Sequence, residues 1–158
     1  MDMMVVGLIY IIPVATSQAL FAEGSYNELE LKNHLKKAIK IISIIIIPAI
    51  LIAVFLGKYI LLAFGKDYSI EGLILLRLLA LSGIFISINS VIGTILRVKH
   101  RIRVLIYINF INTIIILGLS YLFLSKGLLG IGFAWIIGQG LVSLIYLGVI
   151  TNKRFIQF

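Results

Sequence analysis

Hydrophobic residues in this chain fall into long runs that short polar clusters separate. A helix rises 1.5 Å per residue, so about 20 mostly apolar residues are needed to cross a bilayer. The pattern therefore predicts an all-α integral membrane protein with five transmembrane helices in one membrane domain, residues 1–158. The expected spans cover residues 3–21, 41–56, 72–96, 104–124 and 128–150.

The polar segment between the first two runs has a helical pattern of its own. Leu31, Leu35, Ala38, Ile39 and Ile42 recur at helical spacing above a lysine-rich face. Ser25, three residues before Glu28, fits a capping box. Residues 25–40 are therefore expected to form an amphipathic helix along the inner membrane surface that leads into the second span. Its lysines either fix the topology alone or also contact lipid or a partner.

Composition agrees with a membrane protein and excludes a soluble globular enzyme. Hydrophobic residues make up 61% of the chain and charged residues 13%, against roughly 25% charged residues in soluble domains. The chain has no cysteine, which excludes a disulfide framework and a thiolate metal site. Asp2 is the only charge before the first run, which indicates a true span rather than a basic, cleavable signal peptide.

The placement of basic residues predicts the orientation. Ten lysines and arginines lie in residues 22–40, 97–103 and 151–158, whereas three lie in the two intervening loops. Cytoplasmic loops carry the excess of Lys and Arg, so the N-terminus is expected outside and the C-terminus inside the cytoplasmic membrane. The net charge of +8 is then accounted for by topology, and no nucleic-acid partner is expected.

Three of the expected spans carry a stripe of polar and small residues on one helical face. The stripes consist of Ser82, Asn89 and Gly93 in the third span, Asn109, Asn112, Thr113 and Ser120 in the fourth, and Gly132, Gln139 and Ser143 in the fifth. Such stripes either pack membrane helices closely together or line a water-filled cavity, and both roles can hold on one helix.

Arg77 is the one ionisable residue well inside an apolar run. A charge within the membrane is costly, which makes it a functional hypothesis by default. Arg77 lies about 7.5 Å from the start of its span, within reach of the interface. It therefore either extends to the outer interface or faces inward to meet an anion.

No catalytic or metal-binding arrangement is visible. His34 and His100 lie in basic segments without an acid at triad or ligand spacing, and Asp or Glu occurs only at the margins of the spans. The chain is therefore not expected to be an enzyme or to hold a cofactor or a metal ion.

Two segments carry a resemblance to a known family. The first is IIPAILIAVFLGKYILLAFGKDY (Ile46 to Tyr68), with its Phe64-Gly65-x-x-Tyr68 loop, and the second is GLLGIGFAWIIGQG (Gly127 to Gly140), with its Gly130-Ile-Gly132-x-Ala134 helix start. Together they resemble the C-terminal part of polysaccharide transporters, the O-antigen and oligosaccharide-lipid flippases. Their superfamily also holds the lipid II flippases and the multidrug and toxin extrusion antiporters.

The resemblance implies a 12-helix, two-lobed transporter of which this chain supplies the last five helices. Its N-terminal half would then be a missing partner, alongside membrane lipids and a lipid-linked oligosaccharide. The implied function is to move polyprenyl-linked sugars across the membrane by alternating access. The alternatives are half of a multidrug or cation antiporter and a structural remnant that transports nothing.

Candidate substrate-binding residues are chosen on physical type and position. Arg77 is the expected contact for a pyrophosphate. The expected contacts for sugar hydroxyls are Asn89, Asn109, Asn112 and Gln139.

Overall fold

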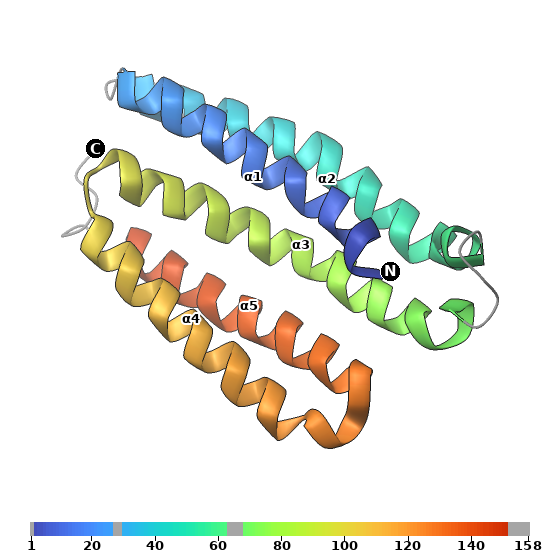
Figure 1. Ribbon diagram of the computed structural model, residues 1–158. Coiled ribbons are helices and arrows are strands. Elements are labelled where there is room, and N and C mark those ends of the chain that lie inside the picture. Colours follow the sequence, from blue (N-terminus) through green and yellow to red (C-terminus); the bar gives the residue numbers. More distant parts are fainter. Residues whose placement is uncertain (1, 27–29, 63–67, 152–158) are drawn as a thin grey trace.

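The computed structural model describes residues 2–26, 30–62 and 68–151, and it is helical along nearly all of this length (Figure 1). The five long helices are α1 (Asp2–Tyr26), α2 (Leu31–Leu62), α3 (Tyr68–Val98), α4 (Ile102–Leu122) and α5 (Gly127–Thr151). A short 3-10 helix, η2 (Leu124–Lys126), joins the last two. The expected all-α class is confirmed.

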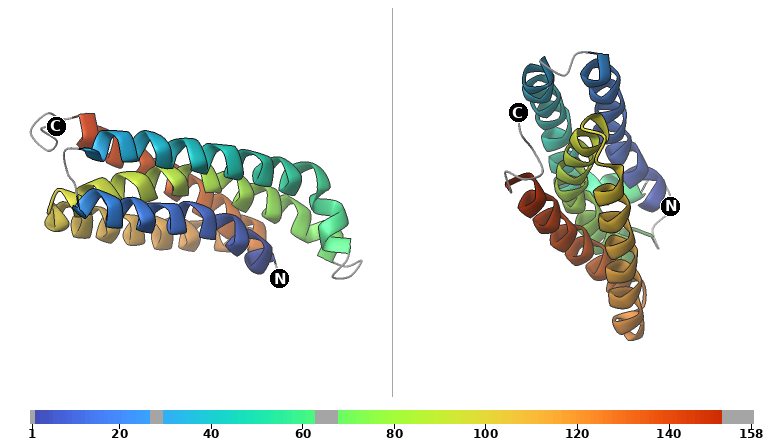
Figure 2. Two further views of the ribbon diagram at one scale, coloured as in Figure 1. Left: turned by 90° about the horizontal axis from the view of Figure 1, so that it is seen from above. Right: turned by 90° about the vertical axis from the view of Figure 1, so that its left-hand side faces the viewer.

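Helix α3 lies at the centre of the bundle. It packs against α1 and α2 on one side and against α5 on the other, and α4 packs mainly against α5 (Figures 1 and 2). The molecule therefore consists of two helix pairs, α1 with α2 and α4 with α5, held together by α3. Grooves can therefore form along α3 on both of its faces, between the α1–α2 pair and the α4–α5 pair.

Four helical segments are long and apolar enough to cross a membrane in the part of the chain that the structure describes. They are Asn33–Leu62, Gly72–Val98, Ile102–Leu122 and Leu124–Thr151. These segments correspond to the second to fifth expected spans. Helix α1 is not among the four, and its side chains at residues 2–5 and 8 are outside the description, so the first span stays a prediction.

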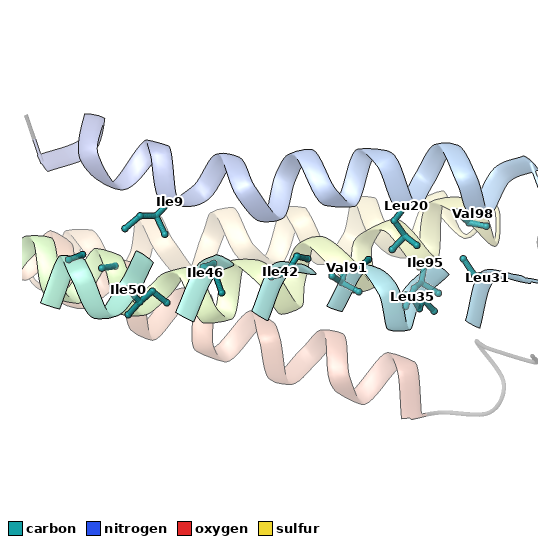
Figure 3. Packing of buried hydrophobic residues seen from close by; sticks show 13 residues of the cluster. Ile9, Leu20, Leu31, Leu35, Ile42, Ile46, Ile50, Val91, Ile95 and Val98 are labelled. Carbon is teal, nitrogen blue, oxygen red and sulfur yellow. The ribbon is translucent and has the colours of Figure 1, made fainter. Parts of the chain in front are cut away.

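The expected amphipathic helix and the second span form one continuous helix, α2. It begins at Leu31 rather than at Ser25, which instead lies in the last turn of α1; Glu28, the other half of the expected capping box, is outside the described residues. No proline or glycine lies between residues 31 and 47 to end the helix. Its buried stripe also continues without a break: Leu35, Ile42, Ile46 and Ile50 all pack toward α1 and α3 (Figure 3).

The two expected cytoplasmic segments lie at the same end of the bundle. The end of α1, the start of α2, the end of α3 and the start of α4 lie at the same end of the bundle in Figure 1. There His34 Nδ1 on α2 lies 2.7 Å from a carboxylate oxygen of Glu23 on α1. Lys37 Nζ lies 4.0 Å from the other oxygen of Glu23. The position of both segments at one end of the bundle agrees with the distribution of lysine and arginine among the loops. The side of the membrane that this end faces stays a prediction.

Candidate functional site

A polar groove of about 620 Å³ runs along one face of α3, between α1 and the α4–α5 pair. This volume lies within the roughly 300–1,000 Å³ that is typical of ligand sites. We call it the polar groove. It is lined by Tyr10 and Val14 of α1, Ile86, Asn89, Ser90, Gly93 and Arg97 of α3, Leu105, Asn109 and Asn112 of α4, and Trp135, Gln139, Val142 and Tyr146 of α5.

The central wall of the polar groove follows from the helical repeat of α3. Asn89, Gly93 and Arg97 are spaced four residues apart, which places them above one another on one face. Gly93 carries no side chain there, so Leu105 and the Tyr146 hydroxyl come close to its backbone. Arg97, in the last turn of α3, is exposed and supplies a positive charge to the groove.

An amide and hydroxyl network joins α3 to α5 beneath the polar groove. Asn89 Nδ2 donates to Gln139 Oε1 at 2.9 Å. Ser143 Oγ lies 2.8 Å from Asn89 Oδ1 and 2.9 Å from the carbonyl oxygen of Gln139. Because hydrogen bonds between membrane helices replace contacts that lipid cannot offer, this network fixes the position of α5 on α3.

A second set of hydroxyls joins α3 to α1. The Tyr10 hydroxyl lies 2.6 Å from Ser82 Oγ and 2.8 Å from the carbonyl oxygen of Leu79. About two turns further along α1, Ser90 Oγ donates to Ser17 Oγ at 2.8 Å. These bonds hold the α1 wall of the groove against α3.

Two buried polar atoms on the groove have no hydrogen bond of standard geometry. They are Asn112 Oδ1, an acceptor, and Trp135 Nε1, a donor. Leaving such an atom unpaired costs about 1–3 kcal/mol. Asn112 Oδ1 is therefore available to a molecule bound in the groove, whereas Trp135 Nε1 lies toward the Tyr10 hydroxyl, and the side chains of Asn89 and Gln139 are already partly used for helix packing.

The structure brings four of the five expected binding residues together. Asn89, Asn109, Asn112 and Gln139 all line the polar groove. Arg77 does not: its side chain is exposed and its Nε donates to the carbonyl oxygen of Val54 on α2 at 3.0 Å. Arg77 precedes Asn89 by 12 residues, about 120° around a helix with 3.6 residues per turn, so the two side chains leave α3 in different directions.

Several groove residues were not among the expected binding residues, and four of these have a charged or aromatic side chain. Arg97 belongs to a basic cluster that topology explains, although its spacing from Asn89 and Gly93 already placed it on the polar face. Trp135 and Tyr146 share a face with Gln139 but have the residue types of an interfacial belt. No sequence pattern marks Tyr10 as a groove residue, because its hydrogen-bond partner Ser82 lies 72 residues further along the chain.

The comparison with protein families decides the relationship of this chain to known proteins. The model of the MatE family matches residues 3–122. The chain belongs to the MatE family. The match spans α1 to α4, and MatE proteins are transporters, which agrees with the expectation that the chain is not an enzyme. MatE belongs to the flippase superfamily that the sequence resemblance indicated, and together with the apolar helices it identifies a multi-pass membrane protein.

Searches of curated proteins and of solved structures found no match to this MatE chain.

Proposed function

We propose that the polar groove is one wall of the substrate pathway in a transporter for polyprenyl-linked oligosaccharides, which works by alternating access at the cytoplasmic membrane. The observation that carries the proposal is the meeting of four amide side chains from α3, α4 and α5 in one groove. Amides both donate and accept hydrogen bonds, as sugar hydroxyls do. Asn112 Oδ1, buried and unpaired, is the acceptor best placed to receive a hydroxyl.

Arg97 replaces Arg77 as the proposed contact for the pyrophosphate. Its guanidinium can bind phosphate oxygens with two parallel hydrogen bonds. Arg97 lines the polar groove, whereas Arg77 lies outside it and already donates to a backbone carbonyl of α2.

A second lobe is part of the proposal. Alternating access needs two lobes that move about a site between them, and this chain supplies one wall. Val14, Asn109 and Arg97 are exposed along the polar groove, and an amide that faces hydrocarbon is costly. We therefore propose that an N-terminal half of the same superfamily covers this face.

One observation favours a second candidate, a drug or cation antiporter. Tyr10, Trp135 and Tyr146 place three aromatic rings on the polar groove, and such rings attract organic cations. Membership of the MatE family is equally compatible with this substrate. Against it, no acidic side chain is found among the described residues that line the groove, whereas proton or sodium coupling commonly uses a carboxylate.

The test is to co-express the chain with the first seven spans of a twelve-span polysaccharide transporter in a strain that lacks its flippase. Co-purification of the two halves establishes assembly, and the intact transporter is the positive control. We expect surface polysaccharide to return with both halves and not with this chain alone. Asn112→Leu should lower it about tenfold at unchanged membrane abundance, whereas Asn33→Leu, an exposed asparagine on α2 outside the groove, should not.

Other outcomes separate the candidates. Drug efflux without polysaccharide export by the assembled pair would identify the antiporter. An assembled pair that transports neither substrate would indicate a structural remnant and would overturn the proposal. Export by this chain alone would remove the need for a second half and would indicate a transporter made of identical copies.

A further inference from the structure

A second groove lies on the opposite face of α3 from the polar groove. Helices α2 and α5 both pack against α3 and leave between them a cavity of about 380 Å³. We call it the apolar groove. Its walls include Leu35, Ile39 and Ile42 of α2, Ile92 and Ile95 of α3, and Ile150 of α5.

The lining of the apolar groove suits hydrocarbon and little else. Ser43 and Ser87 are its polar side chains among the described residues. The hydroxyl of Ser87 is already used, because it donates to the carbonyl oxygen of Gly83 at 2.6 Å. A polar solute would therefore lose its hydration there without gaining enough hydrogen bonds in return.

Two lysines of α2 are next in sequence to residues that line the apolar groove. Lys36 and Lys40 are four residues apart on α2. Lys36 directly follows Leu35 and Lys40 directly follows Ile39, and both of these apolar residues line the groove. Both lysines are exposed, and neither forms an ion pair with an acidic side chain that the structure describes. Lys37, on the α1 side of the same helix, instead lies 4.0 Å from Glu23.

We propose that the apolar groove binds an acyl chain of an anionic phospholipid whose phosphate lies between Lys36 and Lys40. The apolar walls match the chain, and the two cations match the negative headgroup. Lysine stems can extend along apolar surface while the ammonium groups reach the membrane interface. This site is separate from the polar groove, and it does not depend on which substrate the transporter carries.

The test uses photoactivatable phospholipids and the full 158-residue chain in phosphatidylcholine vesicles. One sample contains a trace of phosphatidylglycerol with a photoreactive acyl chain, and the other contains phosphatidylcholine with the same chain. Mass spectrometry of the digested protein then locates the attached lipid. We expect phosphatidylglycerol to label residues 35–43 of α2 and 147–150 of α5 several-fold more than phosphatidylcholine does.

Charge and shape are then removed separately. Lys36→Gln with Lys40→Gln should lower the phosphatidylglycerol label about tenfold and leave the phosphatidylcholine label unchanged. The matched control, Arg101→Gln with Arg103→Gln, removes two exposed charges at the start of α4, at the same end of the bundle, and should have no effect. Ile39→Trp should fill the groove and displace the label, whereas Ile44→Trp, on the exposed side of α2, should not.

Three results would overturn the proposal. Equal labelling by both lipids without dependence on the lysines would mean that ordinary surrounding lipid fills the groove. Labelling confined to other helices would leave the groove without a lipid. Crosslinks between two copies of the chain through residues 35–43, abolished by Ile39→Trp, would make this face a dimer interface. Circular dichroism of each variant establishes that helicity is retained.

Discussion

The side-chain amide of Asn89 on α3 donates a hydrogen bond of 2.9 Å to the side-chain oxygen of Gln139 on α5. Gln139 is 7% exposed, while Asn89 is partly exposed and both line the polar groove. The polar stripes of two helices therefore hold the bundle together and face the groove at once. Packing and cavity lining are two uses of the same residues in this chain.

This pair should be energetically coupled. In a double-mutant cycle, Asn89→Ala and Gln139→Ala should together cost less than the sum of the single changes, by about 0.6–2 kcal/mol. Reversible unfolding in detergent measures each free energy. Asn33→Ala combined with Gln139→Ala is the control and should be additive, because Asn33 is an exposed residue of another helix. Additivity of the Asn89 and Gln139 changes would show that the hydrogen bond does not stabilise the bundle.

Unlike Asn89 and Gln139, Asn112 should not contribute to the stability of the bundle. Its Oδ1 is buried without a hydrogen bond, and removing such an atom relieves a cost of about 1–3 kcal/mol. Asn112→Leu should therefore leave the free energy of unfolding unchanged or raise it, while transport by the assembled protein falls. Loss of stability in the same unfolding assay would assign Asn112 to packing.

The arginines of α3 should differ in their effect on transport. Arg97→Gln should reduce transport at least tenfold and Arg97→Lys should retain part of it, because the charge remains without the two-pronged donor. Arg77→Leu should retain transport, since its guanidinium contacts α2 outside the polar groove. Arg101→Gln, an exposed arginine four residues after Arg97, is the matched control. The transport rate divided by membrane abundance is the measurement, and a loss confined to Arg77→Leu would reverse the assignment.

The sequence predicts the helices better than it predicts their partners. Long apolar runs located α3, α4 and α5, because membrane helices must satisfy their own backbone hydrogen bonds. The start of α2 differed because its buried stripe runs through the polar segment into the apolar one. Helical periodicity was enough to place Asn89 on the face that lines the polar groove.

What the sequence could not supply was the contact between distant segments. The hydroxyls of Tyr10 and Ser82 lie 2.6 Å apart across 72 residues, and no local pattern encodes that pairing. Arg77 was expected to bind an anion because it stands alone in an apolar run, but the rotation of α3 directs it to Val54 of α2. Arg97 was not predicted as a binding residue, because it belongs to a basic cluster whose charges were already explained by the orientation of the spans in the membrane.

The turn between α4 and α5 depends on a glycine. A Cβ at Gly130 would overlap the backbone carbonyl oxygen of Phe123, which cannot move without opening the turn. Gly130→Ala should therefore destabilise the protein by about 1–3 kcal/mol. Gly148→Ala, in the same helix with open space around its Cβ position, is the control and should be neutral or slightly stabilising. The thermal unfolding temperatures of the two variants give the comparison, and equal temperatures would contradict the close contact.

The central claim, that the polar groove is a water-accessible substrate pathway, is tested most directly by cysteine accessibility in the assembled transporter. The chain has no native cysteine, so each introduced thiol reports on one position. Asn109→Cys and Asn112→Cys line the polar groove, whereas Phe110→Cys and Ile114→Cys lie on exposed, apolar parts of the same helix. A charged, water-soluble thiol reagent should modify the first two and not the last two, and added substrate should slow the modification. Equal protection of all four positions from the reagent would contradict the claim and leave the groove as a surface for helix packing.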